Sequence, residues 1–372
     1  MIGKPLGSIA AVLTLLAAAC SQGTKSSGQV APPQVAAADT GPVFDVALLD
    51  TNVSACTDLN AFVNAKWIQA NPIPADKTGW GAFQELSQKS LDEQHQIAET
   101  ADKNADAAQA GSIQQKIGWL YRSGMDSTAI ANAGYDPIKP ALAAIAALKT
   151  PADVSAWLDA SFAAGHGQLF RFGAQADFHD AKMQIGSASQ AGLGLPTPDY
   201  YTKPEFKNLR DAYVQHMAKL FELAGVPAAQ AATQAAAAMA LETSLARHSL
   251  SRVALRNPKN QYHFVSIAQA NGITPHFDWA ALFKAQGVEP GKGFSLSQPE
   301  FFAGVDSLLA HAPIDAWKAY LAFHTINDAA AYLSPPFEAE AFAFNGTTLQ
   351  GQPQQPPRWE RVLGSVNRSM GE

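Results

Sequence analysis

Helical periodicity recurs along this chain from residue 83 to residue 333 and limits what it can fold into. Apolar residues recur at spacings of three and four over seven long stretches, which is the pattern of an amphipathic α-helix. With 372 residues, of which 47% are hydrophobic and 16% charged, the chain can bury a sizeable core. We therefore predict a mainly α, multi-helix fold. The stretches are 83–101, 112–123, 151–164, 206–224, 227–247, 298–311 and 314–333.

One segment breaks the helical pattern. Over residues 169–190 apolar and polar residues alternate, which predicts a small β-hairpin among the helices. The hairpin leads into GLGLPTPDYY, residues 192–201, where Gly and Pro predict a rigid turn. This turn lacks the third Gly and the Lys-Ser/Thr of a phosphate-binding loop, so we exclude that function. The Ala-rich run 228–240 contains Gln and Thr and therefore predicts a packed helix rather than a membrane span.

The N-terminus has the layout of an export signal. Over residues 1–19 Lys4 precedes an apolar run that is too short to span a bilayer, and Cys20 follows. Two kinds of processing stay open: lipidation of Cys20, which we favour, and ordinary signal cleavage after the preceding alanines. Residues 20–43 are rich in Ser, Gly, Pro and Ala and predict a flexible tether. We expect export to the periplasmic face of a bacterial membrane, with membrane contact through the lipid anchor only.

Charge and catalytic motifs exclude several functions. The formal net charge is −6 and the chain has no Lys/Arg cluster, so nucleic acid is not an expected partner. None of the 9 histidines is followed by Glu or has a second His four residues on, so the H-E-x-x-H zinc motif is absent. No G-x-S-x-G nucleophile motif occurs either. We predict no catalytic residue and no metal ligand in this chain.

Three His–carboxylate pairs occur at helical spacing. We interpret all three as surface charge or helix capping, because such pairs commonly lie on solvated helix faces. The pairs are His95/Glu99, His311/Asp315 and His324/Asp328.

The closing segment, residues 358–372, predicts an amphipathic helix. It places Trp359, Val362, Val366 and Met370 on one apolar stripe. Gly371 is only a weak stop signal, so we expect the helix to continue in a longer protein. On that expectation no other part of this chain covers the apolar stripe, which is left unsatisfied.

Cys56 has no partner if Cys20 is lipidated. An odd cysteine in an exported protein is either a small buried hydrophobic residue or one half of a disulfide to sequence that is not present. Both alternatives stay open on the residues alone.

Short blocks of characteristic residues follow one another along the chain. They are Cys56-Thr57-Asp58, Phe62-Val63-Asn64, Lys66-Trp67, Pro72-Ile73-Pro74, Tyr121-Arg122-Ser123-Gly124-Met125-Asp126, Gly192-Leu193-Gly194-Leu195-Pro196, Asp199-Tyr200-Tyr201, Glu242, Gln298-Pro299-Glu300 and Arg358-Trp359. In this order the blocks resemble the N-terminal domain of neprilysin-type zinc metallopeptidases, the family of neprilysin and endothelin-converting enzyme. The resemblance covers residues 44–372.

The resemblance implies a two-lobed, mainly helical metallopeptidase whose first lobe encloses a central cavity and limits substrates to peptides. It also implies that the zinc ligands and the acid/base Asp belong to a later portion, so zinc is a cofactor of the complete enzyme only. Some relatives carry an Arg at the position of Gly79 and an Asp at that of Gln84 to recognise a terminal carboxylate, which Gly79 cannot do. Relatives with a cysteine at the position of Cys56 usually pair it with one near the far C-terminus.

Our leading expectation is therefore the substrate-enclosing N-terminal portion of an exported zinc metalloendopeptidase, inert without its catalytic domain. One alternative is a free-standing helical lipoprotein that binds peptides or a partner. Another is one half of a split peptidase whose catalytic half is encoded separately. Surface meant for a catalytic lobe would leave large apolar patches, so we expect the isolated chain to self-associate.

Overall fold

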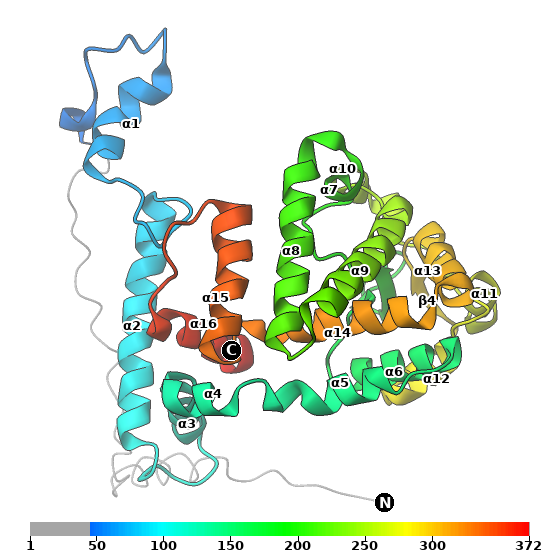
Figure 1. Ribbon diagram of the computed structural model, residues 1–372. Helices are drawn as coiled ribbons and strands as arrows, with labels where there is room; N and C mark the ends of the chain where they lie inside the picture. Colours follow the sequence, from blue (N-terminus) through cyan, green and yellow to red (C-terminus); the bar gives the residue numbers. More distant parts are fainter. Residues whose placement is uncertain (1–44, 372) are drawn as a thin grey trace, which may run out of the picture. The chain divides into compact units, whose positions relative to one another are not determined.

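The computed structural model describes residues 45–371 (Figure 1). The chain divides into two compact units, with the boundary between Asn71 and Pro72. The described part of the first unit contains a short 3-10 turn, Val46–Leu48, and helix α1 (Leu59–Ala70). The Asp58 carboxylate caps α1 by accepting a hydrogen bond from the backbone N–H of Ala61 at 2.9 Å. The predicted leader and tether lie outside the described residues.

Helices make up most of the second unit, and all seven predicted helical stretches are confirmed. They form α2, α3, α6, α8, α9, α13 and α14, while the helices that were not predicted are mostly too short to show a period. No helix in the described part of the chain is long and apolar enough to cross a membrane. The bounds are α2 (Ala82–Asn104), α3 (Ile113–Met125), α4 (Ser127–Ala133), α5 (Lys139–Ala146), α6 (Pro151–Ala163), α7 (Asp199–Thr202), α8 (Lys207–Leu223), α9 (Ala228–His248), α10 (Arg252–Leu255), α11 (Ile267–Ile273), α12 (Trp279–Ala285), α13 (Pro299–His311), α14 (Ile314–Ala330), α15 (Pro335–Phe342) and α16 (Arg358–Met370).

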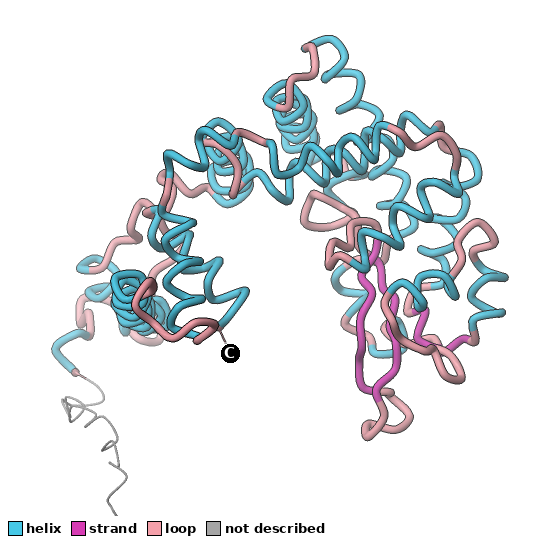
Figure 2. The backbone as a smooth tube through the Cα atoms, turned by 90° about the horizontal axis from the view of Figure 1, so that it is seen from below, coloured by secondary structure: helices cyan, strands magenta, loops and turns pink. Residues whose placement is uncertain are grey.

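The predicted hairpin is confirmed and belongs to a four-stranded sheet (Figure 2). Its strands β1 (Phe170–Ala176) and β2 (Gln184–Gln190) are antiparallel, with Phe170 opposite Gln190. Strand β4 (Phe294–Leu296) runs parallel to β2, and β3 (Phe264–Val265) pairs antiparallel with β4. The sequence did not predict β3 and β4 because two or three residues are too few to show an alternation.

Two large hydrophobic cores stabilise the second unit. The first lies between the sheet, α6, α12 and α13 and contains the fully buried Trp279 and Phe170. The second lies between α8, α9, α14 and α15 and contains Tyr213 and Phe323. Helix α14 contributes to both cores, so it ties them together. The Ala-rich segment is confirmed as the packed helix α9, whose small side chains let its neighbours approach closely.

A third, smaller core joins α2, α3 and α16. Val362, Leu363 and Val366 of α16 are buried here against Ala98 of α2 and Tyr121 of α3. The expectation that the stripe of the closing helix is unsatisfied is therefore wrong for its central residues. Periodicity showed that the helix is amphipathic, but it could not show that α2 and α3 cover its apolar face.

Candidate functional site

The three His–carboxylate pairs lie in three different environments. His95 lies 3.5 Å from Glu99, but its Nε2 also lies 2.9 Å from the buried Tyr121 hydroxyl and its ring stacks on Trp359, so the surface interpretation is wrong for His95. The ring of His311 bonds the backbone carbonyl of Ser307 at 2.9 Å, which is a helix-end contact. His324 is buried, and its Nε2 lies 2.9 Å from Oε1 of Glu242, so the surface interpretation is wrong for this residue. Within residues 45–371 no group of three or more His, Cys, Asp or Glu side chains could hold a metal ion.

Glu242 of α9 is a fully buried carboxylate at the centre of a polar cluster. Its Oε2 accepts hydrogen bonds from the Tyr201 hydroxyl at 2.5 Å and from the Gly194 N–H at 3.1 Å. Its Oε1 accepts one from the Tyr213 hydroxyl at 3.0 Å and faces His324. A buried carboxylate needs such partners because it has lost its hydration. Burial, and then the charge of Glu242, raise the pKa of Tyr201 and Tyr213 well above the usual value, so both hydroxyls remain donors.

This cluster explains the glycines of the segment 192–201. Gly192 has φ of +80°, and a Cβ there would lie 2.5 Å from the Tyr320 hydroxyl. A Cβ on Gly194 would lie 1.8 Å from the Tyr213 hydroxyl. The glycines therefore allow tyrosine hydroxyls to approach the backbone, and the Gly194 N–H is already bonded to a carboxylate. The cluster positions this turn, and the buried Glu242 is not open to a ligand.

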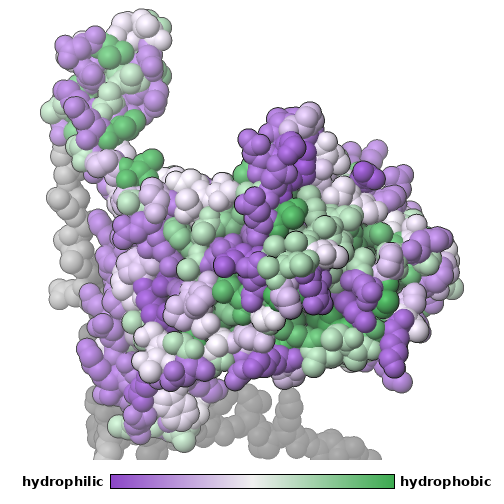
Figure 3. Space-filling model, in the orientation of Figure 1, coloured by the Kyte–Doolittle hydropathy of each residue, from purple (hydrophilic) through white to green (hydrophobic). Residues whose placement is uncertain are grey.

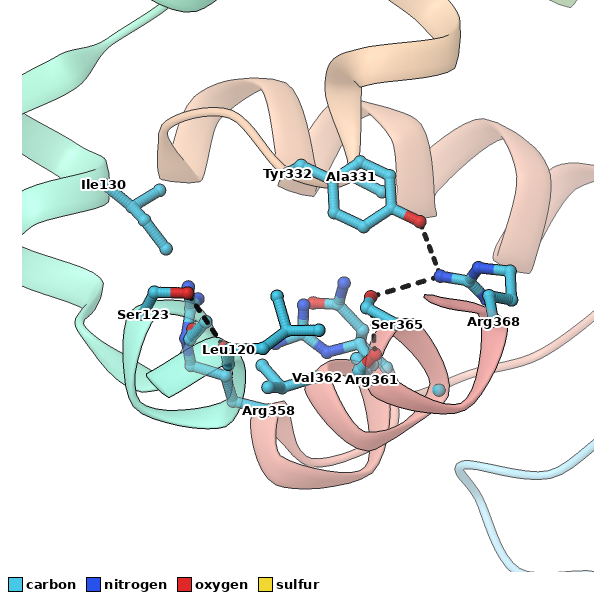
Figure 4. Close-up of a pocket in the computed structure, with 13 residues that line it drawn as sticks. Leu120, Ser123, Ile130, Ala331, Tyr332, Arg358, Arg361, Val362, Ser365 and Arg368 are labelled. Carbon is cyan, nitrogen blue, oxygen red and sulfur yellow. Dashed lines mark hydrogen bonds between the residues drawn. The ribbon is translucent and has the colours of Figure 1, made fainter. Parts of the chain in front are cut away.

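An arginine-rich pocket of about 490 Å³ opens between α3, α4, the end of α14 and α16 (Figure 4). Its polar wall comes from α16, where Arg358, Arg361, Ser365 and Arg368 repeat at spacings of three and four and so share one face. That spacing is visible in the sequence, but it does not show which other helices complete the pocket. The apolar lining includes Leu120, Ile130 and Val362.

Two of the three arginines are held by the protein itself. Arg358 bonds the Gly124 carbonyl at 3.0 Å and the Glu338 carboxylate at 3.3 Å. Arg361 bonds the Pro356 carbonyl at 2.9 Å and forms an ion pair with the same Glu338. Because Glu338 lies on α15 and Gly124 on α3, these bonds hold α16 against α15 and against the end of α3.

The third arginine, Arg368, is exposed at the rim. One of its terminal nitrogens donates to the Tyr332 hydroxyl at 2.5 Å and to the Ser365 hydroxyl at 3.1 Å. Within residues 45–371 no carboxylate lies within ion-pair distance of it. Figure 4 shows Arg368 and Tyr332 at one end of the pocket and Ile130 at the other.

Exposed apolar side chains form a second candidate surface, on α2 and α3. Phe83 is 84% exposed, Ile97 61% and Ile113 70%. A groove of about 620 Å³ runs between the two helices and contains Ile97 and Ile113. Apolar residues also reach the surface where α5, α9 and α14 meet, as Figure 3 shows, and there they line a cavity of about 710 Å³.

The predictions for the two cysteines have different outcomes. Cys20 lies outside the described residues, so its lipidation stays a prediction. Cys56 is a free, exposed thiol in the turn before α1, so the alternative of a buried hydrophobic residue is wrong. A disulfide to sequence that is not present stays a prediction. Around Gly79 there is open space, since no atom lies within 4 Å of a Cβ built there.

Comparisons with known proteins agree on one family. The family model described as peptidase family M13 matches residues 55–372. An endothelin-converting enzyme homolog of Locusta migratoria is 23% identical over 347 residues, covering 88% of this chain and 47% of the relative. The neutral endopeptidase of Lactobacillus helveticus is 25% identical over 334 residues, covering 89% of this chain and 51% of the relative.

The structural comparison gives the same result. The zinc metalloprotease Zmp1 of Mycobacterium tuberculosis, in complex with an inhibitor, matches with a TM-score of 0.84 and 29% identity. That match covers 88% of this chain and 50% of Zmp1. The chain thus spans about half the length of the relatives it matches. The chain belongs to peptidase family M13 and corresponds to the N-terminal domain of these zinc metallopeptidases.

Proposed function

We propose that this chain is the substrate-enclosing N-terminal portion of an exported zinc metalloendopeptidase that acts on peptides. The names of its relatives support this proposal, because they include a neutral endopeptidase and a zinc metalloprotease. Since the chain spans about half of these relatives, we assign catalysis to a further portion and regard this chain alone as inert.

The exposed apolar side chains of residues 72–125, on and around α2 and α3, carry this proposal. Seven of the thirteen exposed large apolar side chains in the described part of the second unit lie in this range, although it is only about a sixth of the described chain. Large exposed apolar patches on soluble proteins usually mark interaction surfaces. In our proposal, the groove between α2 and α3 belongs to the surface that contacts the catalytic portion.

Zinc is implied by the family, but the described residues do not fit it. They contain no group of three candidate ligands, whereas a catalytic zinc site takes three protein ligands and an open position. We therefore assign zinc to the catalytic portion and derive no reaction step in this chain.

Zinc content and peptidase activity of the purified chain test the inert role. We expect zinc well below one equivalent by elemental analysis and no cleavage of a mixed peptide library. Stoichiometric zinc together with cleavage would show that the chain carries its own active site. The DNA beyond codon 372 gives a second test, because an in-frame H-E-x-x-H sequence is expected.

A free-standing binding protein is the second candidate function. The burial of Val362, Leu363 and Val366 favours it, because the closing helix then needs no further sequence to cover its central apolar residues. Absence of an in-frame catalytic sequence would support this candidate. A zinc-containing protein that copurifies with the chain would instead support a split peptidase.

Export and lipidation are part of the proposal and have their own test. Expression of the full chain with native Cys20 in a bacterial host should place the protein in the membrane fraction. Cys20→Ser should release it from that fraction if Cys20 carries the lipid. An unchanged distribution would exclude lipidation as the anchor.

A further inference from the structure

We propose that the pocket between α3, α14 and α16 binds the C-terminal residue of a peptide, with Arg368 binding the carboxylate. The choice of a peptide rests on the proposed function, whereas the pocket belongs entirely to this chain. Gly79 is not among the residues that line this pocket.

The lining of the pocket is positively charged. Three arginines line the pocket, and none of its described lining residues is acidic. Glu338 lies behind the wall, with its side chain 10% exposed, and is shared by Arg358 and Arg361. One carboxylate therefore pairs with two of the three guanidinium groups, which leaves an excess of positive charge that attracts an anion.

Arg368 has N–H groups that are available to a ligand. Its contacts with Tyr332 and Ser365 use one terminal nitrogen, so Nε and the other terminal nitrogen have no hydrogen-bond partner within residues 45–371. The Tyr332 ring lies 6.0 Å from the guanidinium carbon and helps to orient the group. The N–H groups of these two nitrogens point to different sides of the guanidinium, so each can donate a single charge-assisted hydrogen bond to a carboxylate oxygen.

The apolar part of the pocket decides which kind of anion fits. Leu120, Ile130 and Val362 line it, with Ile130 at the end opposite Arg368 in Figure 4. The volume of about 490 Å³ lies within the range of roughly 300–1,000 Å³ that is typical of small-ligand sites. An inorganic anion would leave this apolar surface unused, whereas a C-terminal Leu or Val carries a carboxylate and an aliphatic side chain together.

Equilibrium binding of two matched peptides to the full chain tests this proposal. The first is acetyl-Ala-Ala-Leu with a free carboxylate, and the second is the same peptide as its C-terminal amide. We expect the acid to bind at least about tenfold more tightly, because only the acid offers a charged partner to Arg368. Equal affinities, or no binding of either peptide, would overturn the proposal.

Two variants locate the interaction. Arg368→Gln should lower the affinity of the acid to that of the amide and leave the affinity of the amide unchanged. Arg252→Gln removes an exposed charge on α10 that does not line the pocket, and it should leave both affinities unchanged. Matching circular dichroism spectra would confirm that both variants fold.

An unchanged preference for the acid in Arg368→Gln would contradict the role of Arg368. The measurement needs no catalysis, so its failure would leave the proposed peptidase function untouched. Conversely, zinc or activity in the isolated chain would overturn the inert role without changing these affinities.

Discussion

Helices α14 and α2 bury very different shares of their side chains. In 17 residues α14 buries eight residues, among them Trp317, Tyr320 and Phe323. In 23 residues α2 buries only Ala98 and Ala101, while Phe83 and Ile97 are exposed. Burial of apolar area is the main favourable term in folding. The region around α14 is thus completed by this chain, whereas α2 keeps apolar surface that is suited to a partner.

The largest effect on the free energy of unfolding is expected in the first core, which this chain packs by itself. Trp279 is fully buried in the first core, so Trp279→Ala should lower the free energy of unfolding by about 3–5 kcal/mol. Phe83→Ala should change it by less than about 0.5 kcal/mol, because Phe83 is 84% exposed. Urea unfolding of the two variants measures both values. A similar cost for both would show that α2 is packed as tightly as the first core.

The polar cluster should give the next largest effect. Glu242→Ala removes the acceptor of the Tyr201, Tyr213 and Gly194 hydrogen bonds, so unfolding should become easier by about 3 kcal/mol. Hydrogen exchange at the Gly194 amide should accelerate as the turn loosens. Asp315→Ala is the control, because its side chain is 89% exposed. Unaltered exchange at Gly194 would argue against the positioning role of Glu242.

A smaller, pH-dependent effect is expected at Asp159 of α6. Burial, and then the charge of Asp278, raise the pKa of Asp159 to about 6, and its Oδ1 has no hydrogen-bond partner within the described residues. Because the pKa is raised on folding, the associated stability is present below about pH 3.8 and is lost as pH rises through about 6. Asp159→Asn should therefore stabilise the protein by about 1–2 kcal/mol at pH 7 and have little effect at pH 4. Thermal unfolding at both pH values measures this, and equal effects at the two would contradict it.

Substitutions of exposed apolar residues on α2 should have the smallest effect on stability. They should have a clear effect on self-association. The isolated chain should self-associate, and the double variant Phe83→Gln/Ile97→Gln should shift it toward monomer in sedimentation velocity. Val253→Gln is the control, since Val253 is the single exposed large apolar side chain of α10. A wild-type chain that is already monomeric would show that the α2 surface needs no partner.

Long-range contacts separate what could be predicted from what could not. The hairpin at 169–190 and the seven long helices follow from local periods, so the sequence predicted them. The members of the Glu242 cluster lie on segments that are far apart in the chain, and no local pattern joins Gly194 to His324. The surface interpretation of His324 failed for the same reason, because spacing to Asp328 says nothing about a partner on α9.

The sequence by itself determined the helical class, the family blocks and the amphipathic character of the closing helix. Only the tertiary structure decided that α2 and α3 bury Val362, Leu363 and Val366, and that Arg368 lies beside Tyr332 at a pocket. The physical reason is that periodicity specifies which face of a helix is apolar. The surface that covers this face is fixed only when segments distant in the chain pack together.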